Sequence, residues 1–199
     1  MLLAFDTSSS ACTAALFDGS GACVASADEL IGRGHAERLV PMIAGLMNGG
    51  RAARILVGVG PGSFTGIRVA IAAAQGLAIG WSAELLGMSS LALLAAGRGA
   101  VAAAVQGGHG ELFIQQFDES ANPASELRNA PPSEAARLVS AELVVGSGAA
   151  QLVAARGWGE ALEGSPSAAN ALLLPEALRS LPPRPIYARA PDARVPQAA

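Results

Sequence analysis

The residues best suited to chemistry lie in a glycine-rich run, GVGPGSFTGIR, at positions 58–68. An expected strand over 55–59 leads into this run, and an expected helix over 67–79 follows it. Such a turn presents free backbone N–H groups and the positive end of a helix, which together suit an anion. The run has neither the Lys-Ser/Thr pair of a P-loop nor the G-x-G-x-x-G spacing of a dinucleotide fingerprint. It is therefore an anion site or, as we favour, a tight structural turn formed by Gly60, Gly62, Ser63, Thr65 and Gly66.

Other catalytic groups are scarce in the sequence. Ser63 lacks the G-x-S-x-G setting of a nucleophile elbow. All 13 basic residues are arginines, which excludes a Schiff-base lysine. The two histidines, His35 and His109, are far apart in the sequence, and one imidazole does not make a metal site. We predict no metal site, and we predict that Cys12 and Cys23 are small buried strand residues.

The composition indicates a folded protein in the cytoplasm. The chain has 199 residues, of which 51% are hydrophobic and 15% charged, enough for one domain or two small lobes. No apolar run reaches the roughly 18–20 residues that span a bilayer, and the opening MLLAF is too short for a signal segment. The net charge of −3 gives no overall field that attracts nucleic acid. We expect no membrane contact.

The first half of the chain is predicted to alternate short strands with two helices. The expected strands cover 2–5, 12–17, 22–26 and 55–59. An amphipathic helix is predicted by an apolar stripe at i, i+3, i+4 and i+7, namely Leu39, Met42, Ile43 and Leu46. Pro41 lies inside this stretch and frees the carbonyl of Glu37, so the helix should kink or start late. The helix at 67–79 is rich in Ala and Gly, which favours a buried or interfacial position.

The second half is predicted to repeat this order. Ser89 and Ser90 should cap a helix that runs to Ala96, and 97–99 is a plausible hinge. The elements expected after it are strands at 101–105 and 112–117, a helix from Ser133, a strand at 143–145 and a last helix. Locally paired strands followed by helices, twice in the same order, predict two related α/β lobes. The predicted boundaries are 1–98, 99–190 and a flexible tail at 191–199.

Several motifs resemble those of the TsaB (YeaZ) family, in the same order along nearly the whole chain. The longest is 60–68 with its continuation at 75–78, and the others are 5–7, 35–42, 111–113 and 185–189. The resemblance implies an α/β fold of two duplicated actin-like lobes, as in the actin, sugar-kinase and heat-shock ATPase superfamily. The chain is short for the family, so the second lobe should be trimmed.

The superfamily resemblance also implies the remnant of a nucleotide site. Asp6, followed by Thr7 and Ser8, stands where these ATPases place an acidic residue for magnesium and phosphate, and Gly146 and Gly148 follow a strand as an adenosine-binding turn does. The residues alone leave plain turns as the alternative. A second carboxylate is not apparent. We therefore expect no cofactor, while a nucleotide at a partner interface stays open.

The resemblance implies a non-catalytic subunit that pairs with TsaD, the enzyme that transfers threonylcarbamoyl to the adenosine next to the anticodon of tRNA. The ATPase TsaE would join the assembled complex, and tRNA contact would be indirect. Family pairing uses the first two helices, which implies an interface of His35, Arg38, Leu39, Met42, Ile43, Arg68, Ile71, Ala72 and Gln75. Core packing is the alternative for these residues. Alone, the chain should form a homodimer through the same face.

Rival functions are an active ATPase or small-molecule kinase of the same fold and, more weakly, a metallopeptidase. TsaD holds its metal with two histidines spaced H-x-x-x-H, whereas here Leu39 stands four residues after His35. The family's usual stretch before Glu111 is replaced by Gln106-Gly107-Gly108, which leaves the polar contacts of that stretch open.

Overall fold

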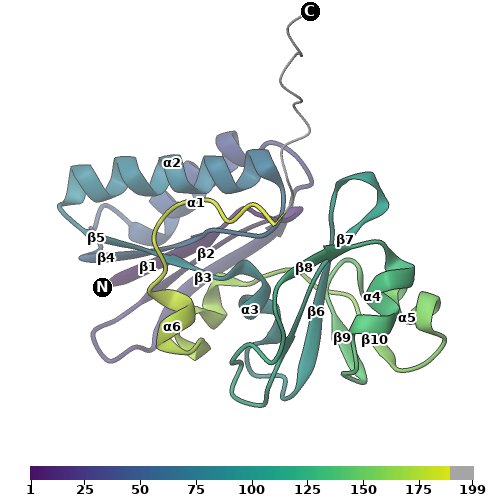
Figure 1. The fold of residues 1–199 in the computed structure, drawn as a ribbon. Helices are drawn as coiled ribbons and strands as arrows, with labels where there is room; N and C mark the ends of the chain where they lie inside the picture. Colours follow the sequence, from purple (N-terminus) through teal and green to yellow (C-terminus); the bar gives the residue numbers. More distant parts are fainter. Residues whose placement is uncertain (189–199) are drawn as a thin grey trace, which may run out of the picture.

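The computed structural model describes residues 1–188, which form two five-stranded sheets (Figure 1). The first sheet consists of β1 (Leu2–Asp6), β2 (Ala11–Phe17), β3 (Cys23–Leu30), β4 (Arg54–Gly58) and β5 (Glu84–Met88). Their order is β3-β2-β1-β4-β5, with β1, β4 and β5 parallel and the other two pairings antiparallel. Arg189 of the C-terminal motif and the expected tail at 191–199 lie outside the described residues.

The second sheet repeats this topology. It consists of β6 (Val101–Gln106), β7 (Leu112–Phe117), β8 (Arg128–Ala130), β9 (Leu143–Val145) and β10 (Glu160–Leu162), with the 3-10 turn η1 (Gly108–Gly110) between β6 and β7. Its strand order is β10-β9-β6-β7-β8. Read from the other edge, the first sheet has the order β5-β4-β1-β2-β3, so β6 to β10 occupy the places of β1 to β5. Helices α1 (His35–Met47) and α2 (Phe64–Trp81) likewise correspond to α4 (Pro132–Leu138) and α5 (Ala149–Arg156). The predicted duplication of an α/β lobe is confirmed.

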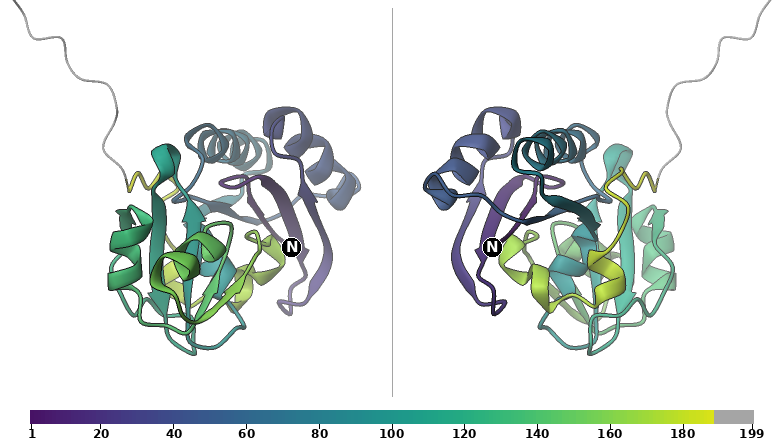
Figure 2. Two further views of the ribbon diagram at one scale, coloured as in Figure 1. Left: turned by 90° about the vertical axis from the view of Figure 1, so that its right-hand side faces the viewer. Right: turned by 90° about the vertical axis from the view of Figure 1, so that its left-hand side faces the viewer.

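The elements stack in layers (Figure 2). Helices α1 and α2 cover the outer face of the first sheet, α4 and α5 cover the outer face of the second, and α3 (Ser90–Ala95) lies between the sheets with all its residues buried. Since side chains alternate along a strand, Leu3 and Phe5 pack with α1 and α2, while Ala4 faces the central layer. The central layer therefore joins the lobes through one shared apolar core.

The helices begin where local capping permits. Ser63 Oγ accepts the N–H of Gly66 at 3.2 Å, so α2 starts at Phe64, before the expected residue. The expected cap of α3 is confirmed, because Ser89 Oγ accepts the N–H of Ala92 at 3.3 Å. Helix α1 begins at His35 after Gly34 in the left-handed region, so Pro41 lies inside it and the late start is wrong.

The chain after β10 returns to the first lobe through η2 (Ala168–Leu173) and α6 (Glu176–Arg179). The N–H of Ala168 donates to Thr13 Oγ1 at 2.8 Å, and Gly87 and Leu181 exchange backbone hydrogen bonds at 2.7 and 3.0 Å. Further on, the N–H of Ile186 donates to the carbonyl of Val59 at 2.8 Å. The segment expected to belong to the second lobe thus also contacts the first lobe, at β2, at the edge strand β5 and just after β4.

The two cysteines differ in burial. Cys12 is buried as expected, but Cys23 is exposed at the start of the edge strand β3, so its predicted burial is wrong.

Within residues 1–188, α2 is the one helix long and apolar enough to cross a membrane by length and composition, a test that helices of water-soluble proteins also pass. It lies along the first sheet, and 28% of its residues are buried.

Candidate functional site

Asp6 is the centre of a buried hydrogen-bond network at the end of β1. Its Oδ1 accepts the N–H and the hydroxyl of Ser8, both at 2.7 Å, and its Oδ2 accepts the hydroxyl of Ser90 at 2.5 Å. Ser90 Oγ in turn accepts the N–H of Gly60 at 3.0 Å. A Cβ at Gly58 would lie 1.7 Å from Asp6 Oδ2, so the neighbouring strand β4 leaves room for this carboxylate only because residue 58 is a glycine. Asp6 and Ser8, predicted to contact nucleotide, are thus bonded within the chain and join β1, the glycine-rich turn and α3.

The glycine-rich turn packs backbone against backbone on the loop between β1 and β2. The N–H of Ser63 donates to the carbonyl of Ser8 at 2.6 Å, and Thr7 Oγ1 donates to the carbonyl of Gly66 at 2.7 Å. A Cβ at Gly62 would lie 2.2 Å from the oxygen of Ser8, and one at Gly66 would lie 1.9 Å from the oxygen of Thr7. Because several N–H groups of the turn bond inside the chain, the geometry favours the structural turn over the anion site.

The turn between β9 and α5 has a similar explanation. The N–H of Gly148 donates to the carbonyl of Ala104 at 3.0 Å, and a Cβ at Gly146 would lie 2.3 Å from that same oxygen. These glycines, predicted to contact adenosine, let the turn approach β6. Ser147 between them accepts the N–H of Gln106 at 3.1 Å and lines the space between the lobes. Ser147 belongs to the turn that the sequence singled out, but the predicted contacts named only its two glycines.

A cleft of about 1300 Å³ lies between the lobes and collects most of these segments. Its walls come from the β1–β2 loop, the glycine-rich turn with Thr65, the β6–β7 hairpin and the C-terminal segment 186–188. Arg33, His35 and Arg68 line it together with a single acidic residue, Glu37. Nε2 of His35 is buried and has no hydrogen-bond partner among the residues that the structure describes. The cleft is large enough for a small molecule, with more basic than acidic groups at its edge.

The predicted partner interface needs correction at four positions. Leu39, Met42 and Ile43 of α1 and Ile71 of α2 are at most 6% exposed and pack on the first sheet. The apolar stripe that identified α1 is the side of the helix that forms the core. These four side chains are therefore core residues, and the alternative of core packing holds for them.

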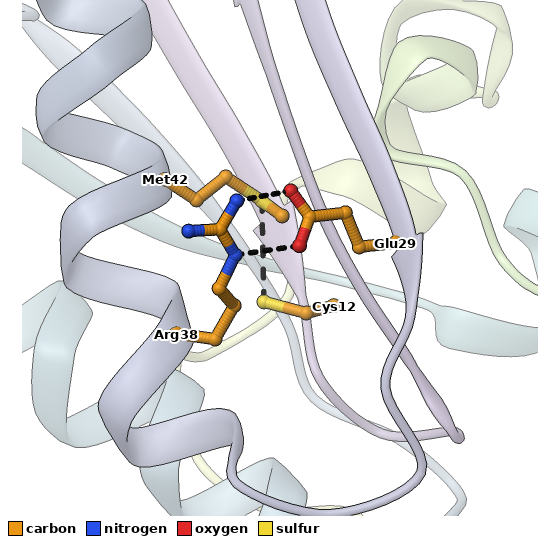
Figure 3. A network of polar contacts seen from close by, with 4 residues as sticks. All are labelled: Cys12, Glu29, Arg38 and Met42. Atoms are coloured by element: carbon orange, nitrogen blue, oxygen red, sulfur yellow. Dashed lines mark hydrogen bonds and ion pairs between the residues drawn. The ribbon is translucent and has the colours of Figure 1, made fainter.

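Arg38, another predicted interface residue, is paired with β3 (Figure 3). Its guanidinium donates to both carboxylate oxygens of Glu29, with Nε to Oε2 at 2.5 Å, and this hydrogen bond lowers the pKa of Glu29. Beneath the pair, the thiol of Cys12 donates to the sulfur of Met42 at 3.9 Å, and burial raises the pKa of Cys12 to about 11. The Arg38–Glu29 ion pair links α1 to the edge strand β3. A partner that binds here must either leave this ion pair intact or replace it with contacts of its own.

The outward sides of α1 and α2 carry small and apolar residues. We call Val40, Ala44, Ala72, Gly76 and Ile79 the α1–α2 outer face; all five are exposed, Val40 by 54% and Ile79 by 83%. The sequence contains no charged residue over 39–47 of α1 or 69–81 of α2. Ala72 and Gln75 of the predicted interface lie on this side, and exposed Arg68 lies one turn before Ala72. Sequence periodicity could not separate this face from the core, because α2 is apolar nearly all round.

Two lobes of one topology around a cleft place the chain among the actin-like ATPase-type folds. Residues 27–156 match the family model described as TsaD: tRNA N6-adenosine threonylcarbamoyltransferase. The chain is 35% identical over 133 residues to the tRNA threonylcarbamoyladenosine biosynthesis protein TsaB of Escherichia coli (strain K12), and 40% identical over 100 residues to the protein of that name from Haemophilus influenzae. The chain belongs to the family of this model and, within it, to the TsaB (YeaZ) proteins.

The extent of these matches differs between sequences and structures. The alignments cover 61% and 47% of this chain and 56% and 41% of the two relatives, so the chain spans about half the length of the curated relatives that it matches. A crystal structure of a Pseudomonas aeruginosa protein with similarity to the peptidase YeaZ superposes with a TM-score of 0.78 at 32% identity. That match covers 94% of this chain and 99% of the other, which confirms the predicted family and fold.

Proposed function

We propose that the chain is a non-catalytic subunit of the machinery that makes threonylcarbamoyladenosine in tRNA. Its role is to pair with a TsaD-type transferase, with TsaE joining the assembled pair and tRNA held by the complex rather than by this chain. The observation that carries the proposal is the uncharged α1–α2 outer face.

Such a face is unusual on a protein that works alone. Burying apolar surface yields about 25 cal/mol per Å², and continuous uncharged patches on helices are typical of docking sites. Ala72 and Gly76 are small enough to let a partner helix approach closely, while Val40 and Ile79 add exposed apolar surface. Two adjacent helices with these side chains suit packing against two helices of another subunit.

The choice of partner follows from the family match. Residues 27–156, which include both helices, match the TsaD model, so a TsaD-type subunit has equivalent helices to present. Pairing of like surfaces is the commonest arrangement in protein dimers. A second copy of this chain offers the same surface, and we propose that the isolated chain forms a homodimer that competes with the partner.

The absence of catalysis is part of the proposal. Both oxygens of Asp6 accept hydrogen bonds within the chain, which leaves this carboxylate poorly placed to hold a metal–phosphate group. The cleft between the lobes favours the rival function, an ATPase or small-molecule kinase, because it could admit a nucleotide. Measuring ATP hydrolysis by the isolated chain separates the two, since turnover well above background supports the rival.

The pairing is tested by the affinity of the purified chain for a TsaD protein from the same organism. Ala72→Arg places a charge on the α1–α2 outer face and should weaken binding about 30-fold or more, because a desolvated unpaired charge costs about 2–5 kcal/mol. The matched control is Ala154→Arg, at an exposed alanine of α5 on the other lobe. Equal affinity for both variants would refute the location of the interface, and no binding by the unmodified chain would refute the partner.

A further inference from the structure

Phe64, Arg68 and Tyr187 form an exposed cluster at the end of α2 nearest the cleft. The guanidinium of Arg68 lies 3.6 Å from the ring centre of Phe64, and its Nε donates to the hydroxyl of Tyr187 at 3.0 Å. The two rings lie 5.2 Å apart. Phe64 is 54% exposed and Tyr187 47%, so both aromatic side chains remain largely in solvent. The cluster joins residues 119 positions apart.

The backbone around Tyr187 holds this cluster in place. The N–H of the preceding residue, Ile186, donates to Val59 on the strand that leads into the glycine-rich turn. A Cβ at Gly60 would lie 3.3 Å from the carbonyl oxygen of Ile186, so the two segments are in close contact. Tyr187 is thereby fixed beside α2, and its hydroxyl orients Arg68 through the bond to Nε.

Arg68 forms no ion pair among residues 1–188, as is true of most arginines in that part of the chain. What sets Arg68 apart is the way its neighbours hold the guanidinium. One face of its guanidinium is covered by Phe64 and its Nε is used by Tyr187, which leaves the edge with the two terminal nitrogens. That edge is the planar fork that binds a carboxylate through two parallel hydrogen bonds.

We propose that this cluster is the anchor for an acidic side chain of the partner subunit that docks on the α1–α2 outer face. This inference rests on the proposed function. The cluster continues the uncharged side of α2, with Arg68 one turn from Ala72, and combines the arginine and aromatic residues that dominate binding energy in interfaces. A net charge of −3 disfavours nucleic acid as the ligand.

The test measures the affinity of the full chain for the TsaD-type subunit as a function of salt. Arg68→Gln should weaken binding about 10-fold or more, because hydrogen bonds between charged groups are the stronger class. Arg68→Lys should fall between this variant and the unmodified chain, since it keeps the charge and loses the fork. Tyr187→Phe keeps the ring and removes the orienting hydroxyl, so it should cause a smaller loss. Arg54→Gln, on the first sheet with the same change in charge, is the matched control.

Salt separates an ionic anchor from a merely structural role. Raising the salt concentration should weaken binding of the unmodified chain more than that of Arg68→Gln. Equal affinities for Arg68→Gln and Arg54→Gln, or equal salt dependence of Arg68→Gln and the unmodified chain, overturn the inference while leaving the pairing intact. The inference also fails if Arg68→Gln spares subunit affinity and instead weakens tRNA binding by the complex. Failure of the unmodified chain to bind the subunit refutes the pairing itself.

Discussion

Gly66→Ala sets two opposite effects against each other at the start of α2. In a helix, alanine is more favourable than glycine by about 1 kcal/mol. The new methyl group, however, would lie 1.9 Å from the carbonyl oxygen of Thr7, which belongs to the backbone of the β1–β2 loop. Rotating a side chain cannot relieve this contact, so loop and helix must move apart.

The size of that movement sets the magnitude. Ordinary contact begins at 3.4 Å, so the two backbones must separate by well over an ångström. The separation strains two hydrogen bonds, Thr7 Oγ1 to the carbonyl of Gly66 and the N–H of Ser63 to the carbonyl of Ser8, each contributing about 1 kcal/mol. Overpacking of this kind costs about 1–3 kcal/mol in addition. After the gain in helix propensity, we expect a net loss of about 2–4 kcal/mol.

Urea denaturation followed by circular dichroism measures this loss, at one fixed protein concentration because self-association shifts apparent stability. The matched control is Gly45→Ala in α1, which is not part of the α1–α2 outer face and where a Cβ meets no atom within 4 Å. This variant should gain about 0.5–1 kcal/mol. If Gly66→Ala is as stable as the unmodified chain, the backbone contact at the turn does not require glycine and the reasoning is wrong.

Three further results are expected. Arg156 donates to several backbone carbonyls at the end of α5, so Arg156→Ala should lower the free energy of unfolding by about 2–4 kcal/mol. Arg54→Ala, at an exposed ion pair, should lower it by less than about 1 kcal/mol in the same denaturation assay. Equal losses for the two variants would contradict this. Burial raises the pKa of Cys12 from 9.0 to about 11. The stability that the folded state gains by keeping this thiol protonated is fully present below pH 9 and is lost as pH rises towards 11. Urea midpoints should therefore fall over this pH range, and they should fall less in Cys12→Ala. Met42→Glu should unfold the chain as judged by near-ultraviolet circular dichroism, because that side chain is 5% exposed, and a native spectrum would refute its place in the core.

Much of the fold could be predicted because its signals are local. The strand at 143–145 and the hairpin of β6 and β7 follow from short apolar runs between turns, and the repeated order of elements predicted the duplication. The strands that escaped prediction are β5, β8 and β10. β5 follows a long apolar helix almost directly, so its residues extend the helical pattern. The other two, β8 and β10, have three residues each and, unlike the equally short β9, contain no continuous apolar run. Their pairing depends on neighbours distant in sequence, which periodicity does not report.

The candidate site was less predictable, for a related reason. The stripe at Leu39, Met42 and Ile43 indicates which side of α1 is apolar, but a core and a docking face are both apolar. Only the position of the sheet shows that this stripe points inward and that Ala72 points outward. Likewise, aspartate at position 6 is the residue type expected in a metal–phosphate site. Its hydrogen bond to Ser90 joins residues 84 positions apart, which a local sequence pattern does not report.

The central claim is that this chain acts by docking, and formation of threonylcarbamoyladenosine in tRNA tests it most directly. The assay combines the TsaD and TsaE proteins of the same organism with tRNA and the other reaction components, and adds the unmodified chain, Ala72→Arg, Ala154→Arg or no chain. The account predicts product with the unmodified chain and Ala154→Arg, and little or none with Ala72→Arg or without the chain. Full product with Ala72→Arg, or without the chain, would contradict it.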